Sequence, residues 1–348
     1  GLGAGLVVIS GDLTLTDSTV SNNTNTGAGS IGGGVVVSAG NLTINDSTIS
    51  GNATQGRGGG ILFGSATDTA TVTNTTISGN TASSGDGGGI SVFQGTFNLN
   101  HSTVTGNTAP AGMGSGLASN SDGTAISNTT VLSSIIAGNA NSDVDNILSG
   151  TGSNTIVSSG FNLIGTTNAT SAFTGTGDVT GVSDPGLAPL ANNGGPTLTH
   201  ALLVNSPAIG AGDTAATETN DQRGAGFARL VGSNVDVGAF ELQATDPSVT
   251  LGVDNASILE AAGVATFTAT LSEISGEDVT VTLGFTGTAT GGGTDYTASG
   301  TQIVIAAGTL SGSITVTAVP DMSDEDDETV IVDITSVAGG TENGTQQA

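Results

Sequence analysis

Residues 58–80 read GGGILFGSATDTATVTNTTISGN, and variants of this phrase recur through the first part of the chain. A glycine cluster opens each copy, and an asparagine that follows Val or Ile and two small residues closes it. A repeat of this length indicates stacked supersecondary units, each of which needs its neighbours to bury its apolar face. The closing asparagines, 29, 28, 27 and 32 residues apart, are Asn23, Asn52, Asn80, Asn107 and Asn139.

Apolar residues alternate with polar ones between the glycines and the asparagine, which is typical of short, half-buried strands. Aligning the copies places like residues in columns, as expected of a parallel β-helix with coils about 4.8 Å apart. The asparagines are expected to stack into an amide ladder at a turn. The four apolar columns are Val20, Ile49, Ile77, Val104, Ile136; Leu15, Ile44, Val72, Leu99; Leu13, Leu42, Ala70, Phe97; and, aligned on the glycines, Val7, Val35, Ile61, Ile90, Leu117.

The motifs Gly58-Gly59-Gly60-Ile61 and Ile77-Ser78-Gly79-Asn80 resemble the repeats of bacterial right-handed parallel β-helix surface proteins of the polymorphic outer-membrane-protein type. That type carries an aromatic residue where this chain has isoleucine. The resemblance implies an all-β, right-handed parallel β-helix (solenoid), which we assign to residues 1–180. Because Gly1 falls inside a repeat, we expect the chain to be a piece of a longer protein.

Composition narrows the possible partners. The chain of 348 residues has 30 acidic residues against 3 arginines and no lysine, a net charge of -27. This balance disfavours nucleic acid and anionic membranes and suits divalent cations. The absence of cysteine excludes disulfides and thiolate metal sites. No apolar run is long enough to span a bilayer, so no membrane insertion of this segment is expected. The scarcity of aromatic residues argues against a stacking platform for carbohydrate.

A different kind of segment follows the repeats. Its ordered motifs resemble the choice-of-anchor Q segment that follows β-helix repeats in bacterial surface proteins. The resemblance implies that residues 181–245 complete and cap the solenoid, whose end would otherwise expose strand edges and an apolar interior. The motifs are Asp184-Pro185-Gly186-Leu187, Asn192-Asn193-Gly194-Gly195-Pro196, Ser206-Pro207-Ala208-Ile209-Gly210, Asp221-Gln222-Arg223-Gly224 and Asp236-Val237-Gly238-Ala239-Phe240.

The charged residues of this segment permit two interpretations. Arg223 and Arg229 lie near Asp221 and Asp236 in the sequence, and arginine-carboxylate forks hold loops rigidly. The alternative is an active site, for which the candidate residues are Asp213, Asp221, Arg223 and His200.

Beyond Asp246-Pro247, which we interpret as a linker, six or seven short alternating strands are separated by turn signals. This pattern predicts an antiparallel, Ig-like β-sandwich over residues 247–340, followed by a tail at 341–348. The stretches Leu259-Glu260-Ala261-Ala262-Gly263 and Gly293-Thr294-Asp295-Tyr296 resemble a Calx-beta domain, as does Val319-Pro320-Asp321 with the acidic run after it.

Acidic residues concentrate in this last segment, because residues 246–348 hold 15 of the 30 and no basic residue. Carboxylates this close repel one another unless a cation intervenes, and Ca²⁺ takes six to eight oxygen ligands. The Calx-beta resemblance implies that the first-loop glutamate and the late acidic run meet at one end of the sandwich. The family's aspartate in an Asp-Gly-Thr-Ala turn is absent, since the turn reads Thr286-Gly287-Thr288-Ala289. The alternative is a solvated acidic loop. The implied calcium ligands are Glu260, Asp321, Glu325 and Glu328.

A polar column lies three residues before the first apolar column. β-Helix polysaccharide lyases and hydrolases also place acids on a strand face, but their chemistry needs clustered carboxylates, or calcium with a strong base, at one locus. Only Asp17 and Asp46 are acidic neighbours here, and Arg57 is the one basic residue of the repeats apart from a histidine. We therefore expect no enzyme. The column is Asp17, Asp46, Asn74, His101 and Ser133.

Together these observations predict a non-enzymatic, extracellular structural or adhesive protein of a bacterial surface, in which a rigid solenoid carries a calcium-binding sandwich. The expected partners are calcium and a host, cell-surface or matrix ligand. One alternative is a subunit of a self-assembling extracellular fibre or filament. Another is a polysaccharide-degrading or carbohydrate-binding β-helix.

Overall fold

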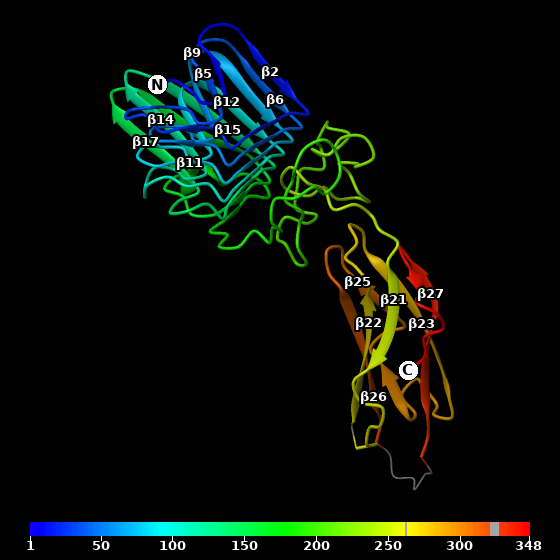
Figure 1. Ribbon diagram of the computed structural model, residues 1–348. Helices are drawn as coiled ribbons and strands as arrows, with labels where there is room; N and C mark the ends of the chain where they lie inside the picture. Colours follow the sequence, from blue (N-terminus) through cyan, green and yellow to red (C-terminus); the bar gives the residue numbers. More distant parts are fainter. Residues whose placement is uncertain (262, 321–326) are drawn as a thin grey trace. The chain divides into compact units, whose positions relative to one another are not determined.

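A computed structural model describes residues 1–261, 263–320 and 327–348 (Figure 1). The chain divides into two compact units, Gly1–Glu241 and Leu242–Ala348, just before the predicted linker. The described residues form strands and loops with one short 3₁₀ helix, η1 (Thr170–Ala172), and no α-helix. The fold is all-β, as the sequence predicted: a parallel β-solenoid of about six turns, followed by a β-sandwich.

Three parallel sheets form the solenoid. The first follows the order β1 (Leu6–Val8), β5 (Val35–Val37), β9 (Ile61–Thr73), β12 (Ile90–Asn100), β14 (Leu117–Gly123), β17 (Val144–Gly150), and also holds β2 (Leu13–Thr16), β6 (Leu42–Asn45), β15 (Ile126–Leu132) and β18 (Ser153–Gly160). The second contains β3 (Thr19–Ser21), β7 (Thr48–Ser50), β10 (Thr76–Ser78), β13 (Thr103–Thr105), β16 (Ile135–Ile136), β19 (Leu163–Ile164) and β20 (Val179–Thr180). The third contains β4 (Thr24–Asn25), β8 (Ala53–Thr54) and β11 (Thr81–Ala82).

The residues of the predicted apolar columns pair with one another in successive coils. Every step of the column from Val20 to Ile136 is a strand pair, and so are the steps of the columns that begin at Leu13 and Leu15. These side chains are buried from the second coil onward and form one continuous core. A parallel stack therefore buries the apolar face that no single coil could bury.

Two expectations about the solenoid need correction. Leu6, not Val7, pairs with Val35, because Leu6 directly follows a glycine as Val35 does. At the last coils, Phe173, which follows η1, packs into the core of the solenoid. The expected cap, residues 181–245, makes its main contacts elsewhere, as described below.

The asparagines that close the repeats form the predicted ladder. The Nδ2 of each donates a hydrogen bond to the Oδ1 of the asparagine one coil on, at 2.9–3.0 Å, from Asn23 to Asn139. The same Oδ1 also accepts the backbone N–H of the preceding asparagine. The ladder ends on Asp143, whose Oδ1 accepts both donors of Asn139 at 2.8 Å. Its three central members are completely buried: Asn52, Asn80 and Asn107.

Residues 184–241, which we call the lateral segment, run along the second sheet rather than over its end. Their backbone and side chains bond to hydroxyls or carbonyls of four successive coils, at Thr48, Thr76, Thr103 and Ser133. These threonines point outward from their strands and yet are buried. The row of outward hydroxyls explains the path, because it gives an irregular backbone regularly spaced hydrogen-bond partners.

The second unit consists of two sheets around a core that includes Phe267, Val281 and Val332. Strand pairing is antiparallel except between β21 and β28. Residues 341–348, expected to be a tail, contribute β28, and Ala348 exchanges two backbone hydrogen bonds with Val332. The sheets are β24 (Tyr296–Ala298), β26 (Ser311–Ala318), β22 (Val264–Leu271), β21 (Ser248–Val253), β28 (Thr341–Glu342); and β25 (Gln302–Ile305), β23 (Val279–Gly287), β27 (Val330–Ala338).

The ladder predicts a position-dependent loss of stability. Asn80→Ala leaves the backbone N–H and one amide N–H of Asn52 without their acceptor, and removes one of the two donors to Asn107 Oδ1. We expect a loss of about 3 kcal/mol or more in the free energy of unfolding, measured by urea denaturation. Asn23→Ala, which removes one donor from the half-buried first rung, is the control and should cost about 1 kcal/mol. Equal losses would contradict the buried ladder.

Candidate functional site

Four carboxylates line one cavity of about 720 Å³ in the sandwich. The loops after β21, β23 and β26 lie at the same end of the antiparallel sheets, and they bring Glu260, Asp295, Asp327 and Glu328 to this cavity. The structure therefore brings together two of the four residues that the sequence predicted, Glu260 and Glu328. Asp321 and Glu325 lie outside the described residues. Asp295 and Asp327 were not predicted as ligands.

The cavity suits a hard cation by the chemistry of its donors. Carboxylate oxygens are preferred ligands of Ca²⁺, and the second unit contains no lysine, arginine or histidine that could neutralise them. Asp295 is held in place by its Oδ2, which accepts the backbone N–H of Thr290 at 2.6 Å. Among the described residues, no group of three or more acids or histidines already has the geometry of a metal site.

The turn that lacks the family's aspartate borders the same acidic end. The Thr329 N–H donates to Thr288 Oγ1 at 2.9 Å, and the Thr288 N–H donates to the Thr329 carbonyl at 3.0 Å. This exchange fixes the turn beside Glu328, which precedes Thr329. The residue in the place of the family's aspartate is Thr286, which carries no charge, so the charge available for a cation is lower.

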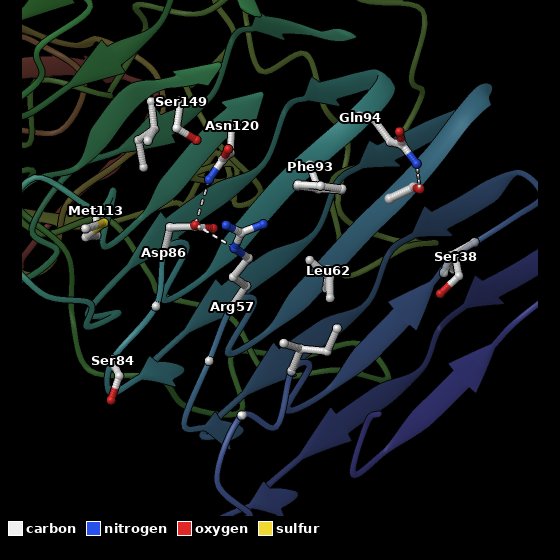
Figure 2. A pocket seen from close by; sticks show the side chains of 17 residues that line it. Ser38, Arg57, Leu62, Ser84, Asp86, Phe93, Gln94, Met113, Asn120 and Ser149 are labelled. Carbon is white, nitrogen blue, oxygen red and sulfur yellow. Dashed lines mark hydrogen bonds and ion pairs between the residues drawn. The ribbon is translucent and has the colours of Figure 1, made fainter. Parts of the chain in front are cut away.

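A second concavity, which the sequence did not predict, lies on the outer face of the first sheet of the solenoid (Figure 2). It is a groove of about 860 Å³. Arg57 Nε lies 3.1 Å from Asp86 Oδ2, and the guanidinium stands 5.0 Å from the centre of the Phe93 ring. Asp86 also accepts the Asn120 amide at 2.8 Å. The one feature of the sequence that could have indicated this groove is Arg57, the single arginine of the repeats.

The polar column on the solenoid is a column of turn residues. All five have a left-handed backbone, with φ between 45° and 51°. Asn, Asp and His are the non-glycine residues that most often adopt this conformation. The acids at Asp17 and Asp46 are thus explained by the turn, and Asp46 Oδ1 accepts the Asn74 amide at 3.2 Å.

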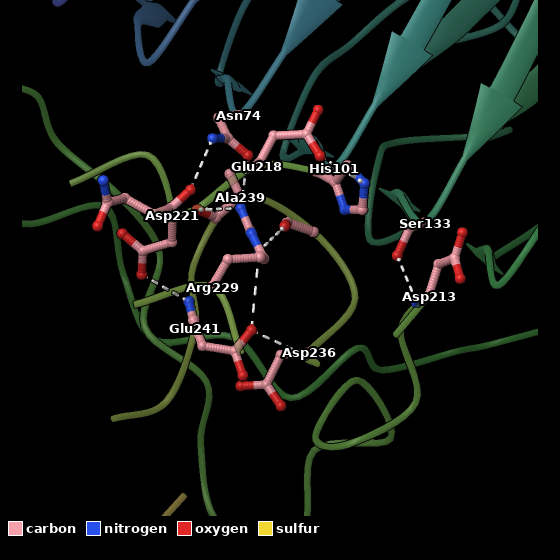
Figure 3. Close-up of polar contacts among 12 residues, drawn as sticks. Asn74, His101, Ser133, Asp213, Glu218, Asp221, Arg229, Asp236, Ala239 and Glu241 are labelled. Atoms are coloured by element: carbon pink, nitrogen blue, oxygen red, sulfur yellow. Dashed lines mark hydrogen bonds and ion pairs between the residues drawn. The ribbon is translucent and has the colours of Figure 1, made fainter. Parts of the chain in front are cut away.

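Two buried arginines hold the lateral segment, and one of them, Arg229, joins it to this column (Figure 3). Arg223 forms the predicted fork with Asp221, at 2.6 Å and 3.0 Å to Oδ2, and its guanidinium stacks on Phe227 and Phe240. Both partners of the fork are buried. The geometry is that of a rigid staple between loops.

Arg229 is the largest fully buried side chain of the protein among the described residues. It donates to Asn74 Oδ1 at 2.6 Å and to the Gly238 carbonyl at 2.9 Å. Glu241 Oε2 lies 3.8 Å from its Nη1, and the charges of Asp221 and Asp236 also act on this guanidinium. Asn74 belongs to a coil, so this arginine ties the lateral segment to the solenoid.

The residues of the alternative active site are held at different places. Asp221 and Arg223 pair with each other, whereas His200 Nε2 lies 2.8 Å from Ser78 Oγ on the third coil. The backbone N–H of Asp213 bonds to Ser133 Oγ, two coils further along. His200 and Asp213 thus anchor the lateral segment to two different coils, whereas Asp221 and Arg223 form a pair within the segment.

Two buried groups of this network have pKa values far from their usual ones. Burial raises the pKa of Glu241 from 4.5 to about 9, and repulsion from Asp236 adds to the effect. Burial lowers the pKa of His101 to about 4, and the charge of Arg229 acts in the same direction. Both side chains are therefore neutral near pH 7, and the Arg229–Glu241 separation is too long for a hydrogen bond.

Comparison with known proteins identifies the second unit. The Calx-beta domain family matches residues 243–348, so the C-terminal part of the chain is a Calx-beta domain, as its motifs suggested. Calx-beta domains are associated in general with calcium binding. No curated protein matches the chain significantly. In the described part of the chain, no helix has the length and hydrophobicity needed to cross a membrane.

The raised pKa of Glu241 predicts an unusual pH dependence. The unfolded chain loses this proton near pH 4.5 and the folded chain only near pH 9, so this group destabilises the fold increasingly as the pH rises between these values. Glu241→Gln keeps an acceptor for the Asp236 N–H and removes the titration. We expect its melting temperature to match that of the wild type at pH 4.5 and to exceed it at pH 8. Asp184→Asn, at an exposed carboxylate, is the control; a variant-to-wild-type difference that does not change with pH would contradict the assignment.

Proposed function

We propose that this protein is a non-enzymatic, extracellular structural or adhesive protein of a bacterial surface. Its solenoid acts as a stiff stalk, and its Calx-beta domain binds calcium. The observation that carries the proposal is the unbroken ladder of amides from Asn23 to Asn139, which is buried at its centre, ends on the carboxylate of Asp143 and is reinforced from the side by the lateral segment.

The stiffness follows from the number of independent bonds between neighbouring coils. The first two parallel sheets, the amide ladder and the apolar core connect successive coils, and the third sheet adds bonds between the first three. Gln222 of the lateral segment adds a bond across coils, because its Oε1 accepts from Thr76 at 2.6 Å and its Nε2 donates to Thr48 at 3.1 Å. Bending the solenoid would have to stretch these bonds together.

The sequence supports an extracellular location. The excess of acidic residues and the resemblance of the repeats and the lateral segment to bacterial surface proteins favour an extracellular protein. Its many buried polar contacts are structural, which favours a scaffold over a catalyst.

Calcium would act at the acidic end of the sandwich. Glu260, Asp295, Asp327 and Glu328 face one cavity without a basic residue in the unit, so a divalent cation would relieve their mutual repulsion. A cation shared by three loops would also hold those loops together. The domain would then be stiffer in calcium-rich surroundings than in calcium-poor ones.

Titration of the full chain with calcium tests this site. We expect a saturable heat in calorimetry and a rise in the melting temperature of the second unit, because a ligand that binds the folded state stabilises it. The double variant Glu260→Gln/Glu328→Gln should weaken binding at least about tenfold. Glu273→Gln, an exposed carboxylate of the same unit outside the cavity, should leave binding unchanged. No heat together with an unchanged melting temperature would remove calcium from the proposal.

Surface labelling tests the location. Antibodies raised against the full chain should label intact cells of the source organism as strongly as permeabilised cells, because an extracellular protein needs no permeabilisation. An antibody against a cytosolic protein of the same cells serves as the control. Labelling that requires permeabilisation would contradict an extracellular role.

A further inference from the structure

The groove on the first sheet is built from successive coils (Figure 2). Leu62, Phe93, Asn120 and Ile147 lie on β9, β12, β14 and β17, and all four line it. These strands are neighbours in the sheet, so the floor extends over three strand spacings, about 14 Å. Loops that precede the strands, at residues 29–31, 56–57 and 84–86, also contribute to the lining. A groove of this shape suits an elongated ligand.

The groove is electrically balanced although the protein is strongly acidic. Arg57 and Asp86 are the charged residues among its described lining residues, and they pair with each other. Asp86 is buried, and its carboxylate also accepts the Ser91 hydroxyl at 2.6 Å. The net charge of the whole chain, -27, disfavours the approach of an anion. The positive charge of Arg57 would repel a cation. A neutral ligand therefore fits the groove best.

One buried polar atom at the groove has no partner. Asn120 is 2% exposed, and its Nδ2 donates to Asp86, but its Oδ1 has no hydrogen bond. Figure 2 shows the amide nitrogen directed at Asp86 and the oxygen on the other side of the amide group. A buried acceptor left unpaired costs about 1–3 kcal/mol. A ligand that brings a hydroxyl donor to this place would recover that energy.

We propose that this groove binds a neutral oligosaccharide chain, which would give the adhesive role proposed above its ligand class. Sugar rings present C–H faces to apolar side chains such as Leu62, Phe93 and Met113, and hydroxyls to the amide of Asn120 and the guanidinium of Arg57. Apolar walls with a few fixed polar groups are the usual composition of a ligand site. The sequence argued against a stacking platform because aromatic residues are scarce, yet the fold places one phenylalanine where a single sugar ring can rest.

Affinity electrophoresis of the full chain in native gels tests the proposal. The probes are three neutral polysaccharides, dextran, laminarin and galactomannan, with polygalacturonate as an anionic probe and unfolded casein as a peptide probe. We expect at least one neutral polysaccharide to retard the protein and the anionic and peptide probes to have no effect. Retardation by none of the neutral polysaccharides, or a stronger effect of casein or polygalacturonate, would overturn the proposal.

Substitutions then locate the binding surface. Phe93→Ala and Asn120→Leu should each raise the dissociation constant for the retarding polysaccharide about tenfold, the equivalent of one lost stacking or hydrogen-bonding contact. Val157→Ala, at an exposed apolar residue of β18 outside the groove, is the matched control and should bind as the wild type does. Circular dichroism verifies that each variant is folded. Unchanged binding in both folded groove variants would overturn the proposal.

The outcomes separate this inference from the proposed function. The calcium titration and the surface labelling do not involve the groove, so their success with no polysaccharide binding would remove the groove proposal alone. Binding that depends on Phe93, together with labelling confined to permeabilised cells, would support the groove and remove the extracellular role.

Discussion

A buried amide that lacks hydrogen bonds costs free energy, and this cost governs the repeated turn of the solenoid. Each ladder asparagine accepts two bonds from the coil before it and donates to the coil after it, in surroundings that exclude water. An unpaired amide there would cost more than one bond is worth, because desolvation is not compensated. The asparagines must therefore stack at the same point of successive coils, and their recurrence every 27 to 32 residues in the sequence records this requirement.

The sequence was most informative where a pattern repeats. Alternating apolar residues between glycine and asparagine were enough to predict the strands, their register and the ladder, because each copy confirms the others. The path of the lateral segment could not be predicted. Its partners, such as Thr48 and Thr76, look in the sequence like ordinary solvent-facing strand residues, and only the fold shows that they are covered. The segment also has an irregular backbone, which carries no periodic signal.

The candidate sites show the same contrast. The Calx-beta resemblance implied Glu260 and Glu328 as ligands, and both line one cavity. Asp295 lies in another of the matching motifs, but it was not predicted as a ligand and lines the same cavity. The groove combines side chains from neighbouring coils, so no local sequence motif predicts it. In the polar column, a pattern that could suggest catalysis has a backbone explanation, the left-handed turn at Asp17 and Asp46.

The lateral segment has a consequence for how such a protein can change length during evolution. A whole coil can in principle be duplicated, since the new asparagine would find the same partners above and below. Between Thr48 and Ser133, however, an extra coil would move the anchoring hydroxyls apart by about 4.8 Å, and the bonds of the lateral segment would no longer match. The lateral segment therefore fixes the number of coils in this stretch. Coils can be gained or lost during evolution only outside it.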